Sequence, residues 1–249
     1  MNKITNFYRM RIFIICIAFV LMSFIPSGNV EKLSLDMTAR TLYKGKSITV
    51  KGELFYKVQG GLMVTRIVSP LEQIVFANAT GEFKSYDVKS NSVTLMQGID
   101  FSSKNSFIYN FLSGNINDMG LSSLGYKLKD TKIDGKVVVS TYMAPSDRVM
   151  EIQKAEIAHE NYLPIFMGFY DAKGNSVQKI YYTNYQNVSH LKMPFTITEI
   201  EFLGQEDSTI TRRTYSNLKV NEQVDNSWFN YQIPANAKIN STNPTLKSK

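Results

Sequence analysis

Few side chains in this sequence are suited to catalysis or metal binding, since it has only two histidines and one cysteine. His159 lies in the run Glu-Ile-Ala-His-Glu that ends at Glu160, which invites comparison with a helical zinc motif. That motif needs two histidines four residues apart, and the second is missing here. The segment also has the pattern of a strand edge that leads to Leu163-Pro164. We therefore predict no metal site, a solvated turn at His159, and a solvent-facing His190 in a polar loop.

Other patterns for enzyme chemistry are also weak. Glu199 and Glu201 fall on one face of an expected strand among polar neighbours, whereas a glycosidase needs two carboxylates that face each other across a cleft. Residues 120–125 have the wrong spacing for a nucleophile elbow, and no phosphate loop or dinucleotide fingerprint occurs. We predict no catalytic residue and no cofactor. An enzyme that uses His159 or Glu160 is kept as a lesser alternative.

The first 28 residues have the plan of a secretory signal peptide. Lys3, Arg9 and Arg11 precede an uncharged apolar run over residues 12–25, and small or turn-forming residues follow at 26–28. The run is shorter than the ~20 residues that a spanning helix needs, although an uncleaved anchor stays an alternative. Cys16 lies inside the run after an isoleucine, so we expect no lipidation there and no cysteine in the mature chain.

The charge balance argues against nucleic acid as a partner. The net charge is +7, and it falls to +4 without the three basic residues of segment 1–28, because no acidic residue lies there. The lysines are scattered rather than clustered with aromatic residues, so we predict no nucleic-acid binding.

Most of the remaining chain alternates between apolar and polar residues, which predicts half-buried strands. Asp134-Gly135 between two such runs is a strong hairpin signal. About ten or eleven strands are expected, and an antiparallel sheet of that size must curl. We predict a mainly β protein with a few short helices, built as an unclosed antiparallel barrel. The expected strands cover residues 48–58, 62–68, 71–77, 83–88, 92–97, 126–133, 136–143, 162–170, 176–185, 195–203 and 209–220.

One segment has helical rather than strand periodicity. Residues 103–112 place an apolar stripe on one side of a helix, with Ser102 or Ser103 as its cap and Gly114 at its end. A short helix between strands must bury its stripe, and the curved sheet offers the large apolar surface. We expect weaker helical or turn-like structure at 115–124, a helical turn at 35–42, and a polar, frayed tail at 240–249.

The aromatic content suggests what the curved sheet encloses. The chain has 14 tyrosines and 15 phenylalanines, and several lie on alternating positions. Either these side chains fill the inside of the sheet themselves or a ligand does. We predict that a lipid binds there, between the sheet residues Leu54, Tyr56, Val64, Ile74 and Phe76 and the lid residues Phe107, Ile108, Phe111 and Leu112.

Several short motifs in a fixed order resemble the periplasmic outer-membrane lipoprotein carrier (LolA-like) and the wider lipoprotein-sorting family. They include Gly-Glu-Leu-Phe-Tyr-Lys at 52–57, the Pro-led strand at 69–75, the helix at 106–114 and the Trp-Phe to Ile-Pro stretch at 228–234. The resemblance covers about residues 48–239. We assign residues 29–239 to one LolA-like domain.

The resemblance implies an unclosed β-barrel with helices that close its mouth, and a periplasmic location. It implies a monomer that accepts the acyl chains of lipoproteins from an inner-membrane transporter and carries them to an outer-membrane acceptor. The alternative is a non-catalytic lipid-binding envelope module tethered by an uncleaved N-terminus. The family's early strand has an arginine after its lysine, which helps to set the lid, but here Val58 follows Lys57 and the nearest arginine is Arg66.

Overall fold

The computed structural model describes residues 29–147, 150–204 and 207–241. The expected signal peptide 1–28, with Cys16, and residues 242–249 of the expected tail lie outside the described residues. Within the described part of the chain, no helix has the length and apolar character needed to cross a membrane.

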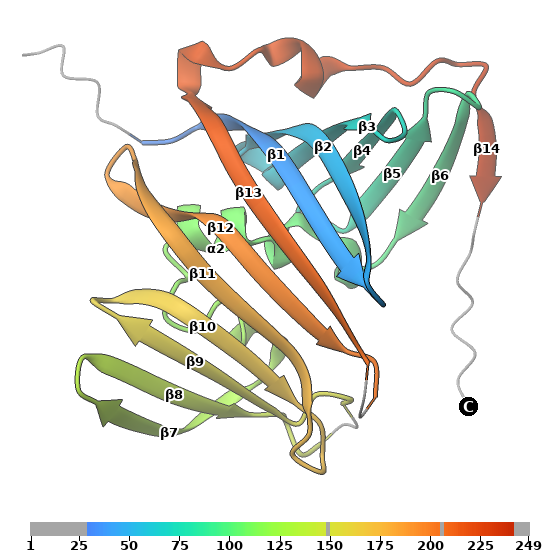
Figure 1. Ribbon diagram of the computed structural model, residues 1–249. Coiled ribbons are helices and arrows are strands. Elements are labelled where there is room, and N and C mark those ends of the chain that lie inside the picture. The colour runs from blue at the N-terminus through green and yellow to red at the C-terminus, as the bar shows by residue number, and fades with distance from the viewer. Residues whose placement is uncertain (1–28, 148–149, 205–206, 242–249) are drawn as a thin grey trace, which may run out of the picture.

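Fourteen strands form one continuous sheet in the order β14-β6-β5-β4-β3-β2-β1-β13-β12-β11-β10-β9-β8-β7 (Figure 1). The strands are β1 (Lys32–Tyr43), β2 (Lys46–Lys57), β3 (Leu62–Ser69), β4 (Gln73–Ala77), β5 (Glu82–Asp87), β6 (Ser92–Gln97), β7 (Lys127–Asp134), β8 (Val137–Met143), β9 (Lys154–Glu160), β10 (Leu163–Tyr170), β11 (Ser176–Val188), β12 (Leu191–Phe202), β13 (Ser208–Val220) and β14 (Lys238–Ser241). The helices are α2 (Phe107–Leu112) and the 3₁₀ turns η1 (Gln59–Gly61), η2 (Ile99–Phe101), η3 (Ser103–Asn105), η4 (Ser122–Leu124), η5 (Asn221–Gln223) and η6 (Asn226–Asn230).

The sheet curls without closing, as the sequence predicts. Its two edges are β7 and β14, which do not pair with each other. Strand pairing is antiparallel throughout, except that β14 runs parallel to β6. The count of ten or eleven strands is too low, because β1 and β14 were not predicted as strands and β9 was expected only as a strand edge.

The expected helical turn at 35–42 is wrong, because these residues belong to β1. This strand pairs along its length with β2 on one side and with β13 on the other. Its sequence alternates, with Leu33, Leu35, Met37 and Ala39 separated by polar residues, so the period of two that is typical of a strand was present and was misread as a helical turn. The solvated turn expected at His159 is also wrong: His159 lies half-buried in β9, where Ile157 is fully buried.

Apolar side chains are buried on both faces of the sheet, in two separate clusters. We call the cluster that includes α2 the concave cluster and the cluster on the opposite face the outer cluster. The buried members of the concave cluster are Leu33, Leu35, Leu54, Tyr56, Ile108, Phe111, Met119, Leu121, Tyr126, Tyr142, Ala155, Ile157, Met167, Tyr182, Val188, Met193, Phe195, Ile197 and Tyr215. Those of the outer cluster are Phe55, Val64, Ile74, Tyr86, Val93 and Val224.

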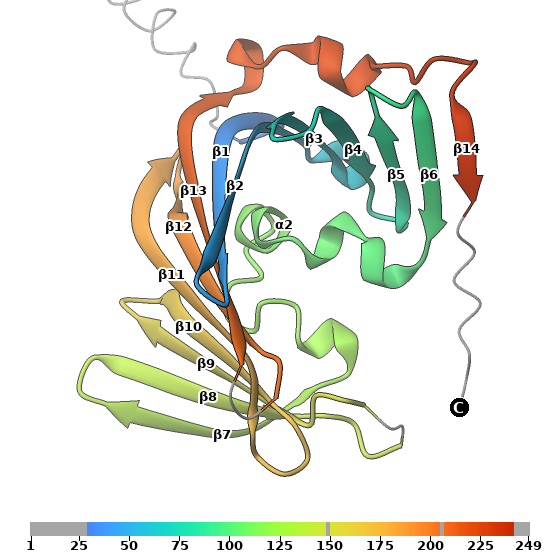
Figure 2. The ribbon, with the colours of Figure 1, turned by 45° about the vertical axis from the view of Figure 1, so that its right-hand side comes forward.

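The position of α2 follows from the strand order. The chain leaves β6 near one edge of the sheet and enters β7 at the other edge. The connection at residues 98–126 must therefore cross the whole sheet, and it crosses on the concave side (Figure 2). It contains α2, three 3₁₀ turns and an irregular stretch.

The outer face of β2–β6 is covered by the chain itself. After β13 the chain runs over this face through η5 and η6 and then adds β14 beside β6 (Figure 2). Trp228, Phe229, Tyr231 and Ile233 of this C-terminal segment pack on the outer cluster. We call residues 221–237 the C-terminal strap.

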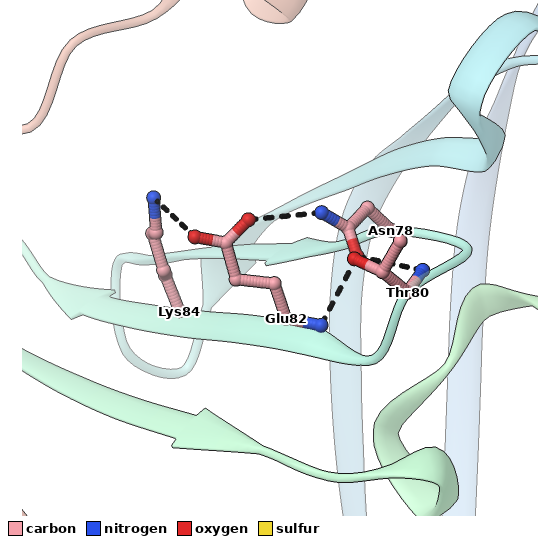
Figure 3. Close-up of polar contacts among 4 residues, drawn as sticks. All are labelled: Asn78, Thr80, Glu82 and Lys84. Carbon is pink, nitrogen blue, oxygen red and sulfur yellow. Dashed lines mark hydrogen bonds and ion pairs between the residues drawn. The ribbon is translucent and has the colours of Figure 1, made fainter.

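The turn between β4 and β5 anchors the start of the crossing connection. The Asn78 side-chain oxygen accepts hydrogen bonds from the backbone N–H groups of Thr80 and Glu82, each at 3.0 Å (Figure 3). The Asn78 side-chain amide donates a hydrogen bond to the Glu82 carboxylate. This carboxylate also forms an ion pair with Lys84. The turn fixed in this way accepts a hydrogen bond from the backbone N–H of Ser103 at the Asn78 carbonyl. The connection is therefore attached to the sheet just before α2 begins.

Candidate functional site

The lid helix α2 is short and is held mainly at its N-terminal end. The buried Ser103 hydroxyl donates to the Gly61 carbonyl at 2.6 Å, and the Ser102 hydroxyl donates to the Ala79 carbonyl at 3.0 Å. Ser106, rather than Ser102 or Ser103, caps α2, because its hydroxyl accepts from the Tyr109 N–H at 3.2 Å. The helix therefore begins later than predicted, after the 3₁₀ turn η3. Gly114 has a positive φ of 74° just beyond the helix, as predicted for its end.

Aromatic contacts seat α2 on the middle strands. The Phe107 ring lies 5.1 Å from the Tyr215 ring of β13, and the Phe111 ring lies 6.1 Å from Tyr182 and 6.0 Å from Tyr185 of β11. Ile108 is fully buried between these contacts. The helix thus presents its predicted apolar stripe to the sheet.

These contacts do not fill the concave side. A cavity of about 630 Å³ remains between α2, the following loop and the sheet. Most of its lining side chains are apolar, and we call this cavity the hollow. Its apolar lining residues are Met37, Leu54, Met63, Phe107, Ile108, Tyr109, Met119, Leu121, Leu124, Met167, Phe169, Ile180, Tyr182, Ile197 and Tyr215.

The structure divides the predicted lipid-binding residues between the two faces. Leu54 and Tyr56 lie in the concave cluster, together with the lid residues Phe107, Ile108, Phe111 and Leu112. Of these six, Leu54, Phe107 and Ile108 line the hollow, whereas Tyr56, Phe111 and Leu112 pack in the cluster without lining it. Val64, Ile74 and Phe76 do not line the hollow, because they belong to the outer cluster under the C-terminal strap.

The register explains this difference. Val64 lies opposite Phe55 on one side and Phe76 on the other, and cross-strand partners point to the same face of a sheet. Phe55 is adjacent to Leu54 and Tyr56 along β2, so it points to the other face. The prediction treated the alternation of each strand separately and did not fix the register between strands.

The sequence analysis missed the central strands of the hollow. Met63 of β3 lies opposite Tyr56, and Met37 of β1 lies opposite Tyr215. Ile180 of β11 and Ile197 of β12 complete the apolar lining farther along the sheet. Alternation within β11–β13 was visible in the sequence, but it could not be assigned to a face without the pairing of these strands with β1.

An ion pair borders the hollow among these apolar groups. Arg213 Nη1 lies 2.5 Å from Glu199 Oε1, with the two side chains 35% and 20% exposed. Burial alone would lower the pKa of Arg213, but the adjacent Glu199 carboxylate raises it, so the guanidinium stays charged. The solvated face predicted for Glu199 and Glu201 is wrong for Glu199, which lines the hollow, whereas Glu201 is exposed.

Several tyrosines belong to the concave cluster, and Tyr182 and Tyr215 line the hollow with the ion pair. Burial raises the pKa of Tyr56 to about 12, and it also raises the pKa values of Tyr182, Tyr185 and Tyr215. The Tyr185 hydroxyl donates to the Pro164 carbonyl, and the Tyr182 hydroxyl contacts the Met167 sulfur at 3.4 Å. These phenols are neutral at physiological pH and act as apolar rings.

Arg66 does not face α2. It lies on the outer face, where it pairs with Glu53 at 3.0 Å and stacks over Trp228 at 5.1 Å. The arginine that borders the hollow is Arg213 of β13, which the sequence analysis did not single out.

His159 holds the loop that follows α2. One of its ring nitrogens, Nε2, lies 2.8 Å from the Ile116 carbonyl oxygen, and Ile116 packs on the concave cluster. His190 is exposed, as predicted. No group of three or more metal-binding side chains occurs among the residues that the structure describes.

A second large cleft, of about 810 Å³, lies where the described chain begins. Its lining from residues 29–32, 57–59 and 226–230 is mainly polar, apart from Val30, Val58 and Phe229. The hollow has many more apolar lining side chains than this cleft, as expected for a site that binds an apolar ligand. The hollow is therefore the candidate functional site.

Comparisons with known proteins identify the fold. No protein-family model and no curated protein matches the sequence. Among solved structures, a DUF1329 family protein from Desulfovibrio piger superposes with a TM-score of 0.56 at 15% identity, covering 84% of this chain and 93% of that one. A putative outer membrane lipoprotein-sorting protein domain from Vibrio parahaemolyticus gives 0.57 at 17% identity, covering 80% and 89%. A LolA superfamily protein from Nitrosomonas europaea gives 0.54 at 13% identity, covering 80% and 90%.

The protein therefore has the LolA-like fold that its motifs suggested: a long, unclosed antiparallel sheet with short helices on its concave side. Identities of this size establish the architecture alone.

Proposed function

We propose that this protein is a periplasmic carrier that binds the acyl chains of lipoproteins or other lipids in the hollow and moves them towards the outer membrane. The observation that carries the proposal is the mostly apolar cavity of about 630 Å³ between α2 and the sheet. Its volume is within the range of roughly 300–1,000 Å³ that is typical of small-molecule sites. The LolA-like fold of the solved structures supports the same proposal.

The energetics of an acyl chain explain why such a cavity is needed. Transfer of a chain from an apolar environment to water costs about 0.8 kcal/mol per CH₂, so a chain of some sixteen carbons requires on the order of 10 kcal/mol of shelter. Phe107, Ile108 and the apolar side chains of β11–β13 supply surfaces for that shelter. Nothing in this role requires a catalytic group.

The lid is built so that it can move. It has six residues, and its hydrogen bonds to the sheet lie mainly in the segment that precedes it, at Ser102 and Ser103. The helix itself is seated by side-chain packing on Tyr182, Tyr185 and Tyr215. Displacement of α2 therefore costs mainly apolar contacts, which an entering acyl chain can replace.

Lipid analysis of the purified protein tests the proposal. Wild-type protein purified without detergent should yield an acyl lipid on solvent extraction and mass spectrometry, at about one molecule per protein. Ile180→Trp is the matched variant, because Ile180 is half-buried and lines the hollow, and a larger ring there occupies the space of the ligand. Wild-type protein that is repeatedly free of lipid, or a variant that retains the same amount, would contradict the carrier.

Two further measurements address the shuttle. Sequencing of the mature N-terminus separates a soluble carrier, cleaved near residue 28, from a module tethered by its N-terminus. Transfer of a fluorescent acyl lipid between two vesicle populations across a dialysis membrane should be faster with the wild-type protein than with Ile180→Trp. Equal rates would mean that the hollow binds lipid without carrying it.

A further inference from the structure

The C-terminal strap covers only part of the outer face of the sheet. It packs on the outer cluster, whose sheet residues lie on β2–β6. Strands β1, β13, β12 and β11 follow β2 in the sheet. In Figure 1 these four strands lie in front of α2, and the strap runs along the top of the picture. Their outward side chains are therefore open to a partner.

The register gathers four cations on this part of the outer face. Arg40 of β1 lies directly opposite Arg212 of β13, and cross-strand partners point to the same face of a sheet. Lys51 of β2 and Lys179 of β11 lie in the neighbouring rows on either side. We call the outward residues of these three rows the cationic face: Lys51, Thr38, Thr214, Thr196 and Thr183; Thr49, Arg40, Arg212, Thr198 and Tyr181; and Ser47, Leu42, Ile210, Ile200 and Lys179.

The cations of this face have no acidic partner among the described residues. The three rows contain no carboxylate, and none of the four cations takes part in an ion pair of the described chain. Arg40, Arg212 and Lys51 are exposed. Like charges directly opposite each other destabilise a sheet, so an external anion that binds between Arg40 and Arg212 would relieve a repulsion.

The carboxylates that border the cationic face already have partners. Towards the strap, Asp36 accepts a hydrogen bond from Asn217 at 2.6 Å, and Glu53 pairs with the arginine of β3. Towards the hairpin turns, Asp207 pairs with Lys44 at 3.1 Å. The positive charge of the three rows is therefore not neutralised from either end.

We propose that the cationic face docks the protein on the surface of an anionic phospholipid bilayer. Lys51 and Lys179 lie on strands that are four strand spacings apart, or about 19 Å. A single phosphate group cannot contact both, whereas a bilayer surface presents many anionic groups. The serine and threonine hydroxyls between the cations supply further donors to phosphate oxygens. The inference goes beyond the proposed function, because it concerns the face opposite to the hollow.

Cosedimentation with vesicles tests the docking face. The full chain without its first 28 residues should bind vesicles of phosphatidylcholine and phosphatidylglycerol in a two-to-one mixture, and it should not bind vesicles of phosphatidylcholine alone. Binding should disappear between about 0.01 M and 1 M salt, because the Debye length falls from ~30 Å to ~3 Å. This comparison uses the wild-type protein and depends on no variant.

Two matched double variants assign the binding to the cationic face. Arg40→Gln with Arg212→Gln should weaken binding about 25-fold, since each cation near an anionic surface contributes ~1 kcal/mol, or about fivefold. Lys127→Gln with Lys129→Gln is the control, because it removes the same charge from exposed positions of β7 at the edge of the sheet, and it should stay within twofold of the wild type. Urea unfolding should show no loss of stability in either variant.

Each remaining outcome decides for or against the docking face. Equal binding to both kinds of vesicle, or an equal loss in the two double variants, would contradict it. Release of the protein from vesicles by millimolar glycerol phosphate would mean that the face holds single phosphate groups and not a bilayer surface.

The variant Ile180→Trp separates the docking face from the carrier. This substitution fills the hollow on the other face, so the variant should bind anionic vesicles as the wild type does. Loss of vesicle binding in this variant would place the attachment in the hollow and contradict the docking face. Wild-type protein that binds anionic vesicles but yields no extractable lipid would support the docking face and contradict the carrier alone.

Discussion

Strand β2 contributes to two apolar clusters that are closed in different ways. Leu54 and Tyr56 face the concave cluster, and Phe55 between them faces the outer cluster. The outer face is covered by the C-terminal strap, in which Trp228 stacks on Phe55 and Tyr231, each at 5.7 Å. The concave face is covered by a six-residue helix and retains a cavity of about 630 Å³.

The difference shows that an apolar sheet face alone does not identify a ligand site. Both faces bury aromatic and branched side chains, and in sequence both appear as alternating strands. What distinguishes them is the covering segment. The strap runs along the outer face and is followed by the paired strand β14, whereas α2 lies in a connection that crosses the concave face between the two edges of the sheet. Substitutions on the packed face and on the open face should therefore differ in their effects on stability and on lipid binding.

The largest expected effect is alkaline destabilisation that originates on the concave face. Tyr56, Tyr182, Tyr185 and Tyr215 have raised pKa values, mainly through burial. Above about pH 10 the unfolded chain loses these phenolic protons while the folded protein retains them, so stability falls as pH rises. The loss at pH 11 is about 1 kcal/mol per tyrosine, from the ~1.4 kcal/mol per pKa unit.

Urea unfolding at pH 8 and pH 11 measures this loss. Tyr56→Phe should make the protein less sensitive to pH, because one titrating group is removed from the concave face. The same sensitivity in this variant and in the wild type would show that Tyr56 does not contribute to the alkaline loss.

The next effect comes from the outer face. Trp228→Ala removes the ring that links Phe55, Tyr231 and Arg66, and it should reduce the free energy of unfolding by about 3 kcal/mol. Affinity for a fluorescent fatty-acid probe should stay within twofold of the wild type, because Trp228 does not line the hollow. A large loss of affinity at unchanged stability would mean that the strap, rather than α2, covers the ligand site.

A pair of enlarging substitutions compares the free space on the two faces. Val64 of the outer cluster is fully buried, so Val64→Trp should overpack it and cost at least ~1–3 kcal/mol of stability. Ile180→Trp on the concave face should cost much less, because the ring extends into the hollow, but it should weaken binding of the fatty-acid probe. Equal losses of stability, measured by urea unfolding, would mean that the hollow is not usable space.

The smallest effects concern the two ion pairs. Glu53→Gln breaks the ion pair with Arg66. The side chains of Glu53 and Arg66 are each more than a third exposed, so the substitution should lower the free energy of unfolding by no more than ~0.5 kcal/mol. Glu199→Gln leaves Arg213 without its counter-ion beside the apolar hollow, so its cost should be larger, about 1 kcal/mol. Urea unfolding of both variants measures the two losses of stability. A larger loss for Glu53→Gln than for Glu199→Gln would contradict the prediction that the ion pair beside the hollow is the stronger one.

Local patterns predicted much of the fold. Hairpins such as the one at Asp134-Gly135 formed where turn residues separate alternating runs, and the apolar stripe at Phe107, Ile108 and Phe111 predicted the helix and its buried side. β1 was missed although Leu33, Leu35 and Met37 alternate with polar residues, because this period of two was misread as a helical turn.

The site was only half predictable. Assigning Val64, Ile74 and Phe76 to a face required the register with Phe55, which no local pattern gives. Arg213 and Glu199 come from adjacent strands whose polar residues resemble a solvated face in sequence. Their proximity depends on the register between β12 and β13.

A photoreactive acyl chain tests directly whether lipid binds in the hollow. A palmitoyl probe with a diazirine at mid-chain, irradiated with the protein and mapped by peptide mass spectrometry, should attach to α2 and to the hollow-lining residues Met63, Ile180 and Tyr215. Excess unlabelled palmitoyl lipid should prevent the attachment. Labelling centred on Phe76, Trp228 and Ile233 of the outer face, or labelling that excess lipid does not reduce, would contradict an acyl-chain site between the lid and the concave sheet.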